Sequence, residues 1–304
     1  MNSGFVYCEQ VGPQAAGQSV LGYLARRYRH STEGVWQARI EAGEVLVGDA
    51  TAVATDVLHA GQSLVWRRPP WEEPPVPLAF AVLHRDHHLL AVAKPRGLPA
   101  LPNGGFLTHT LLLLVRERFP EATPMHRLGR GTSGLLLFAR TPEARRALSA
   151  AWRRGEVEKV YRALVSGIPD RPRFSIETPI GLVPHPRLGR VHAASSQGRP
   201  AVTHVRVLEE RGGDALVEAT IPTGRPHQIR IHLARSGHPL VGDPLYGAGG
   251  LPAREPGLPG DPGYRLHAHR LGFPHPATGH RMELECPLPP ALQSTSLTRA
   301  GRQG

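Results

Sequence analysis

Cysteine is almost absent from this chain of 304 residues, which contains only Cys8 and Cys286. Without a C-x-x-C pair or a Cys/His ligand spacing, neither a disulfide framework nor a zinc site is expected. Long apolar runs are absent too, since none approaches the roughly 18 residues of a membrane span. The opening residues, "MNSGFVYCEQ", lack the basic and apolar regions of a signal peptide. We therefore expect a cytoplasmic protein with no membrane partner.

Acidic residues are outnumbered. There are 25 Asp and Glu against 36 Lys and Arg, which gives a formal net charge of +11 at pH 7. Such a field attracts polyanions, so nucleic acid is the first partner to consider, although a general enrichment in arginine produces the same balance. The histidines are scattered, and "HRDHH", residues 84–88, indicates a solvated turn rather than a metal site.

A proline-rich segment, "RRPPWEEPPVP" at residues 67–77, interrupts the chain and favours an extended linker. We predict a small domain over residues 1–68, a linker over 69–77 and a larger domain over 78–304. In the small domain, apolar residues at helical spacing predict one helix from Val20 to about Tyr28 and a second helix around Trp36 that ends at Gly43. Short strands follow, with a turn at Gly48.

Three arginines, Arg26, Arg27 and Arg29, accompany the first of these helices. Two helices and a small basic sheet are compatible with a packing appendage, but the arginines favour a small α/β RNA-binding domain.

The larger domain is rich in strand signals: "LLAVAKP", "LLLFAR", "KVYRALVSG", "VTHVRVLEE", "ALVEATI" and "RMELECPL". One helix is well marked in "TPEARRALSAAWRRG", with Thr141 as N-cap, Pro142 in the first turn and Gly155 as the stop. Residues 247–263 are rich in Gly and Pro and predict a loop. Because hairpins are mixed with isolated helices, we predict an α+β fold with a mostly antiparallel central sheet.

The stretch "HRLGRGTSGLLLFAR", residues 126–140, has the G-x-G-x-x-G spacing of a dinucleotide-binding loop. That fingerprint needs a strand before the glycines and a helix after them. Here a compact apolar run of strand type follows instead. A nucleotide-dependent oxidoreductase is therefore improbable.

Two other segments place polar residues within apolar runs. In "TGRPHQIRIHLARSGHPLVGDPLYG", residues 223–247, we read the alternation of polar and apolar residues after the first few positions as a strand. Its polar residues are Arg225, His227, Gln228, Arg230 and His232. In "EKVYRALVSG", Tyr161 interrupts another strand. Singly, such residues are more often packed or solvated than functional.

These motifs together resemble the RluA-type RNA pseudouridine synthases. The resemblance covers about residues 80–290 and rests on "KPRGLPALP", "HRLGRGTSGLLLFAR", "KVYRALVSG", the segment 223–247 and "LHAHRLGFPHPATG". The N-terminal part resembles the small ribosomal-protein-type RNA-binding domain that many members carry. The resemblance implies a pseudouridine synthase fold and isomerisation of uridine in rRNA or tRNA, by a monomer that uses no cofactor and no metal.

The resemblance also implies roles for particular residues. In the family, an Asp directly after "HRL" acts at the sugar, a Tyr at the position of Tyr161 stacks on the base and helps to move the C5 proton, and an Arg at the position of Arg225 pairs with the Asp. Further contacts to the substrate RNA are expected from the same motifs: His126, Arg127, Thr132, His227, Gln228 and Arg230.

This sequence departs from the family at one position, because Gly129 stands where the Asp is expected. We expect the missing side chain to leave space opposite Arg225 for a short acid. Asp243 is expected in a structural turn. Two hypotheses follow: a pseudouridine synthase with an altered site, or an inactive RNA-binding homologue that acts in RNA folding or ribosome assembly. A carboxylate within about 3 to 4 Å of Arg225 would favour the enzyme.

Overall fold

The computed structural model describes residues 1–294, and their contacts form two compact units. Unit 1 contains Met1–Glu73 together with Pro184–Arg190, and unit 2 contains the rest of the described chain, beginning at Pro74. The break after Glu73 lies within the proline-rich segment. No sequence signal indicated that residues 184–190 belong with unit 1. The bounds of the three predicted segments stay a prediction.

Unit 1 is a small α/β unit. Its elements are β1 (Phe5–Gln10), α1 (Val20–Arg27), α2 (Glu33–Glu41), β2 (Val45–Val47), β3 (Ala50–Thr51) and β4 (Ser63–Arg68), with a short 3-10 turn at Pro13–Ala15. The strands form an antiparallel sheet in the order β1-β4-β2-β3. Both predicted helices are confirmed, and Gly43 follows the end of α2 with a positive φ of 71°. Strand β1 was not predicted. Its first four residues are all exposed.

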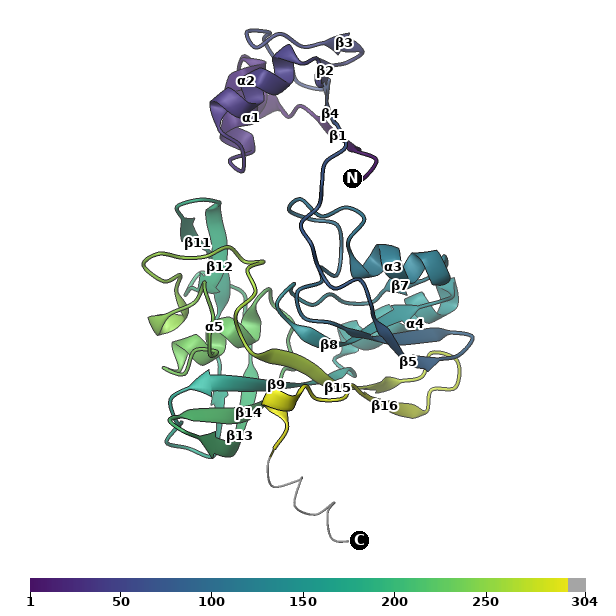
Figure 1. Ribbon diagram of the computed structural model, residues 1–304, viewed down its shortest axis with the longest axis vertical. Helices are drawn as coiled ribbons and strands as arrows, with labels where there is room; N and C mark the ends of the chain where they lie inside the picture. The colour runs from purple at the N-terminus through teal and green to yellow at the C-terminus, as the bar shows by residue number, and fades with distance from the viewer. Residues whose placement is uncertain (295–304) are drawn as a thin grey trace. The chain divides into compact units, whose positions relative to one another are not determined.

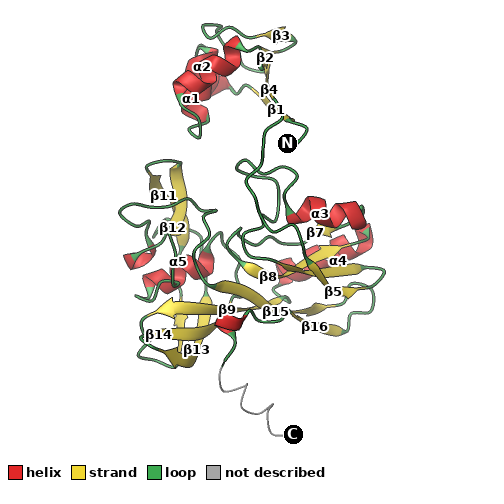
Figure 2. Cartoon of the chain, in the orientation of Figure 1, coloured by secondary structure: helices red, strands yellow, loops and turns green. Residues whose placement is uncertain are grey.

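Unit 2 is built on one large sheet (Figure 1). Its strands are β5 (Ala81–Arg85), β6 (Leu89–Lys94), β7 (Thr123–Pro124), β8 (Ser133–Ala139), β9 (Glu158–Ser166), β10 (Arg173–Ile176), β13 (Thr203–Arg211), β14 (Asp214–Thr220), β15 (Leu266–Pro274) and β16 (Arg281–Glu285). The order is β10-β13-β14-β9-β15-β8-β6-β5, with β16 beside β15 and β7 beside β8. Of these pairs only β15 with β8 is parallel. The predicted α+β fold with a mostly antiparallel sheet is confirmed, and Figure 2 shows how few helices accompany the strands.

A separate hairpin joins β11 (Ile180–His185) to β12 (Gly189–Ala194). The helices of unit 2 are α3 (Leu111–Arg118), α4 (Pro142–Arg154) and α5 (Gln228–Arg235), with short 3-10 turns at Ala248–Gly250 and Pro290–Leu292. Within residues 1–294 no helix is long and apolar enough to cross a membrane.

Helices α3 and α4 cover opposite faces of the same strands. In β8, Leu135 and Leu137 pack in a cluster with α4, whereas Leu136 and Phe138 pack in a cluster with α3. This alternation follows from the two-residue repeat of a strand. It explains why "LLLFA" is apolar throughout: both of its faces are buried.

Helix α4 begins and ends as its sequence predicts. The Thr141 side chain accepts a hydrogen bond from the Ala144 N–H, and Gly155 takes the left-handed conformation at the C-terminus. These signals act over a few residues, so local sequence is enough to set both ends.

The strand predicted within residues 223–247 is wrong, because Gln228–Arg235 is helix α5. The alternation of Ile229, Ile231 and Leu233 misled the reading. Every residue from Gln228 to Ala234 is buried, so the helix has no solvent face to produce the usual helical period. Ile229 and Leu233 pack in one cluster and Ile231 and Ala234 in another, so the helix buries apolar residues on two sides and its sequence pattern imitates that of a strand.

Candidate functional site

The segment Gly129–Thr132 belongs to the loop that connects β7 to β8. Leu128 is buried, whereas Arg127 and Gly129 are exposed. The loop is fastened at Arg130, whose carbonyl accepts hydrogen bonds from the Gly97 N–H (2.8 Å) and from the Lys94 Nζ (3.3 Å). We call residues 126–132 the HRLG loop.

His126 anchors the start of this loop. Its Nε2 accepts a hydrogen bond from the Leu137 N–H at 3.1 Å, and its ring stacks on Trp152 of α4 with centroids 5.6 Å apart. Burial, together with the charge of Lys159, lowers the pKa of His126 to about 4. The ring is therefore neutral near pH 7 and its acceptor nitrogen is occupied, which gives His126 a structural role.

Tyr264 occupies the space beside Gly129, which corrects the expectation of open room there. A Cβ added to Gly129 would lie 2.9 Å from the Tyr264 hydroxyl, and one added to Gly131 would lie 2.8 Å from its ring. The hydroxyl lies 3.2 Å from Thr132 Oγ1, and the side chain is only 1% exposed. The two glycines thus let a buried tyrosine pack directly against the loop.

Arg225 has no carboxylate partner within 4.0 Å among residues 1–294. Its Nε donates to the Pro200 carbonyl at 3.0 Å. Nearby, the Lys159 ammonium donates to the Thr223 carbonyl at 3.1 Å, and burial lowers the pKa of Lys159. Arg225 therefore lacks, among the described residues, the carboxylate partner that the family pattern implies.

Arg230 does have a carboxylate partner. Its Nε and Nη2 each donate to one oxygen of Asp243 at 2.7 Å, and the two side chains are 3% and 1% exposed. The guanidinium also lies between the rings of Tyr246 and Tyr264, at 5.0 and 4.2 Å from their centroids. Removing either side chain of such a buried ion pair would leave the other charge buried without a partner, so each side chain stabilises the other. As predicted, Asp243 belongs to a structural turn, since it also accepts the Leu245 N–H.

Gln228 is likewise turned inward. Its amide accepts hydrogen bonds from the Thr223 hydroxyl (2.8 Å) and the Arg225 N–H (3.0 Å), and donates to the Val202 carbonyl (2.7 Å). The side chain therefore shapes the turn that presents Arg225. In this structure the polar ends of Gln228 and Arg230 are used by protein partners, and the RNA contacts expected of both stay a prediction.

His227 has the left-handed backbone, with φ of 57° and ψ of 19°, and it is the N-cap of α5. Its Nδ1 lies 2.7 Å from the Tyr246 hydroxyl, which itself donates to the His192 carbonyl. Because a hydroxyl has one proton, Nδ1 must be the donor to Tyr246, and Nε2 is left as an acceptor. Burial, followed by the charge of Arg230, lowers the pKa of His227 to about 3. This acceptor therefore stays unprotonated at neutral pH.

Tyr161 lies on β9 between two small neighbours, Ala219 on β14 and Ala268 on β15. It packs partly buried against the cluster that contains Leu128 of the HRLG loop. Its hydroxyl has no hydrogen-bond partner among the described residues, and burial raises its pKa to about 12. The Tyr161 side chain is thus a protonated phenol, and its hydroxyl is available to a ligand.

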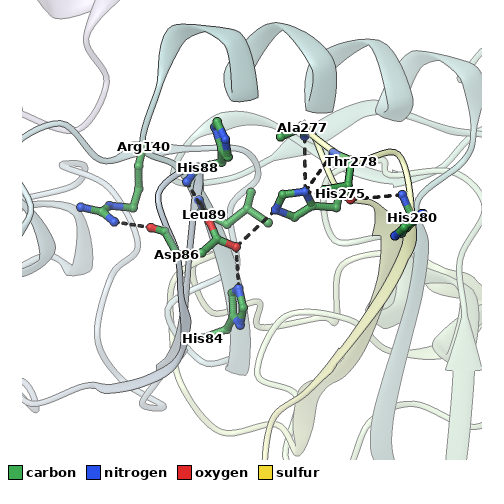
Figure 3. A network of polar contacts seen from close by, with 9 residues as sticks. All are labelled: His84, Asp86, His88, Leu89, Arg140, His275, Ala277, Thr278 and His280. Atoms are coloured by element: carbon green, nitrogen blue, oxygen red, sulfur yellow. Dashed lines mark hydrogen bonds and ion pairs between the residues drawn. The ribbon is translucent and has the colours of Figure 1, made fainter.

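Asp86 lies at the centre of the contacts in Figure 3, where His84, the backbone of His88 and His275 meet it. Its carboxylate accepts the N–H groups of His88 and Leu89, both at 2.7 Å, and contacts Nε2 of His84 (2.8 Å) and of His275 (3.3 Å). The predicted turn is confirmed. In the described part of the chain no cluster of His, Cys, Asp or Glu could hold a metal ion.

Arg26 and Arg27, in the last turn of α1, and Arg29, just after the helix, are exposed. Arg26 donates to Gln18 at 2.7 Å, and Arg27 lies 3.8 Å from Glu9 with a side chain 60% exposed. RNA contacts by Arg26, Arg27 and Arg29 stay a prediction.

Sequence reasoning missed Tyr264 and Lys159. Tyr264 follows a loop rich in Gly and Pro and lies far along the chain from Gly129, so no local signal links the two. Lys159 stands two residues before Tyr161 in a predicted strand, and that alternation could have placed both on the same side of the sheet.

Comparison with known proteins agrees with the motifs. The family model for RNA pseudouridylate synthase matches residues 88–235. An uncharacterized RNA pseudouridine synthase of Synechocystis sp. is 46% identical over 90% of this chain and 95% of its own length. Ribosomal large subunit pseudouridine synthase D of Neisseria meningitidis is 36% identical over 89% of this chain and 75% of its own length.

Solved structures give the same answer. Human RNA Pseudouridylate Synthase Domain Containing 1 matches with a TM-score of 0.58 and 28% identity, covering 77% of this chain and 98% of the human one. Fold, motifs and relatives agree, and the chain is a member of the RluA-type RNA pseudouridine synthase family.

Proposed function

We propose that this protein isomerises uridine to pseudouridine in rRNA or tRNA, acting as a cytoplasmic monomer. The observation that carries the proposal is Tyr161: a half-buried ring beside the HRLG loop whose hydroxyl is not used by the protein. An aromatic face with a free polar tip suits a flipped base, which needs both stacking and a hydrogen bond. A relative named as a synthase of the large ribosomal subunit makes rRNA the first substrate to test.

The reaction needs no redox partner. The N1–C1′ bond breaks, the base turns, and C5 bonds to C1′; the proton on C5 is then lost and N1 gains one, so atoms balance. With a pKa of about 12, Tyr161 stays protonated near neutral pH. It therefore holds the base and can donate a hydrogen bond, whereas a phenolate base would need a much higher pH.

The unpaired Arg225 supports a second candidate function. No described carboxylate lies within 4.0 Å of it, and the space beside Gly129 is taken by the Tyr264 hydroxyl. A pocket that keeps its cations and loses its acid can still bind RNA through phosphates. The competing candidate is therefore a homologue that binds uridine-containing RNA without isomerising it and assists RNA folding or ribosome assembly.

Tritium release from C5-labelled uridine in ribosomal RNA distinguishes the active synthase from the inactive homologue. We expect release by the wild type and loss of release in Tyr161→Phe, while Tyr7→Phe, which removes an exposed hydroxyl of unit 1, behaves as the wild type. RNA affinity of Tyr161→Phe should change little, because the ring remains.

A folded wild type that binds RNA but releases no tritium from any cellular RNA would establish the inactive homologue instead. Mapping pseudouridines in cells with and without the gene then identifies the substrate, because a site made by this protein disappears with it.

A further inference from the structure

A group of four arginines that the uridine site does not use lies on helix α4 and just before it: three are in the helix and Arg140 precedes it. Arg140, Arg145, Arg146 and Arg153 line a cleft of about 650 Å³, and we call them the α4 arginine surface. The cleft contains one carboxylate, that of Glu121, so cations exceed anions by three. All of these residues belong to unit 2.

Helical geometry puts two of these arginines, Arg145 and Arg153, on one line along α4. Ala144, Leu148 and Ala151 form the buried face of α4. Arg145, Ser149 and Arg153 follow one another at four-residue steps on the outer face, so the two arginines start about 12 Å apart along the helix axis. Two separate anionic groups can therefore be bound at the same time.

Two of the four arginines have no protein partner. Arg140 donates to Glu121 at 2.7 Å and to the Asp86 carbonyl, and Arg146 donates to Glu143 at 2.9 Å. Neither Arg145 nor Arg153 makes a side-chain hydrogen bond or an ion pair within residues 1–294, and both are exposed. The first pair is held in place by the protein, and the second pair is free to bind a ligand.

The surface adjoins the start of the HRLG loop. Thr123 of β7 lines the cleft, and the chain runs from β7 directly to His126. The His126 ring stacks on Trp152, which immediately precedes Arg153. A strand of RNA whose uridine lies at the loop can therefore continue over α4.

We propose that the α4 arginine surface binds the phosphate backbone of the substrate RNA outside the flipped nucleotide. The proposal rests on the proposed action on RNA. A nucleic acid strand offers one phosphate at each nucleotide, so a row of guanidinium groups meets several anions in sequence. Acidic side chains of a folded protein match such a row only where their own spacing happens to agree, which makes RNA the favoured partner.

The test compares Arg145→Gln/Arg153→Gln with a charge-matched control, Arg171→Gln/Arg173→Gln, which removes two exposed arginines at β10. The probe is purified large-subunit ribosomal RNA, and Kd is measured across a series of salt concentrations. Losing two phosphate contacts should make the slope of log Kd against log salt shallower by about 1.4 to 1.8 and weaken binding roughly tenfold. The control should change neither slope nor affinity to that extent.

Three results would overturn the proposal. These are unchanged binding in the α4 variant, an equal loss in the control, or competition by poly-glutamate that is as effective as RNA and depends on the two α4 arginines. The proposed isomerisation is judged separately. A wild type that binds through α4 yet releases no tritium contradicts the activity and leaves this surface intact.

Discussion

At the scale of single residues, the absence of a side chain at Gly129 leaves the space that the Tyr264 hydroxyl occupies. The backbone at Gly129 is outside the left-handed region, so an L side chain is permitted there by conformation. What opposes a side chain is one atom, because only the Tyr264 hydroxyl and Thr132 Oγ1 lie within 4 Å of the added Cβ, at 2.9 and 3.6 Å. Removing that hydroxyl is therefore enough to make space.

This pairing predicts how Gly129→Asp behaves. Alone, it should lower the free energy of unfolding by about 1 to 3 kcal/mol through overpacking, and it should not raise tritium release. Tyr264→Phe alone should cost about 1 kcal/mol, since it ends the contact with Thr132. The double variant should be more stable than the sum of the two losses implies, which urea denaturation of all four proteins measures.

The same four proteins also test whether a carboxylate at position 129 supports isomerisation. If the new carboxylate reaches the pocket, tritium release should be higher in Gly129→Asp/Tyr264→Phe than in either single variant, because the Asp supplies a charge opposite Arg225. Strict additivity of the two stability changes would show that Gly129 and Tyr264 do not share this space.

At the scale of elements, Asp86 fastens the β5–β6 turn to the connection between β15 and β16. Burial works against ionisation, but hydrogen bonds from His84, Leu89, His88 and His275 outweigh it and lower the pKa of Asp86 to about 2. A carboxylate with a depressed pKa contributes stability above its unfolded value of 3.8, and this contribution is lost as the pH falls through 2.

Asp86→Asn should therefore destabilise unit 2 by about 1 kcal/mol at pH 7, a figure reduced for partial exposure to solvent. The difference in free energy of unfolding between Asp86→Asn and the wild type should stay constant down to about pH 4 and shrink between pH 4 and 2. Denaturant midpoints of both proteins across this range measure it. A difference that grows on acidification would contradict the assignment.

At the scale of the whole molecule, the excess of positive charge belongs to unit 2, because unit 1 contains eight arginines and eight acidic residues. Unit 1 nevertheless has three arginines close together in sequence, Arg26, Arg27 and Arg29, and all three are exposed. Phosphate contacts position an RNA without reading its sequence. The positive charges of these three arginines are thus expected to add affinity for RNA, while the choice of uridine is expected to depend on the site in unit 2.

Replacing Arg26, Arg27 and Arg29 with alanine should weaken RNA binding broadly and leave the modified uridine unchanged. Each lost contact should flatten the salt dependence by about one unit of slope or slightly less. Binding titrations at several salt concentrations, with mapping of the modified position, provide the measurement. If the triple variant binds as tightly and with the same slope, this helix face is only a solvated surface.

The sequence by itself determined the features whose causes are local or are carried by long motifs. The ends of α4 depend on Thr141 and Gly155, which act within one helical turn. The strands of the large sheet are marked by apolar runs bounded by turns, and the ordered motifs indicated the family, as the relatives confirm.

Only the tertiary structure decided which distant residues meet. Helix α5 resembled a strand because its burial on all sides comes from packing, and the ion pair of Arg230 with Asp243 exists because the chain's path after the helix brings that acid back to it. Tyr264 reaches Gly129 because β15, which begins just after that tyrosine, pairs with β8, which begins just after the HRLG loop. A sequence encodes short-range preferences residue by residue, whereas such contacts exist only once the sheet has brought its strands together.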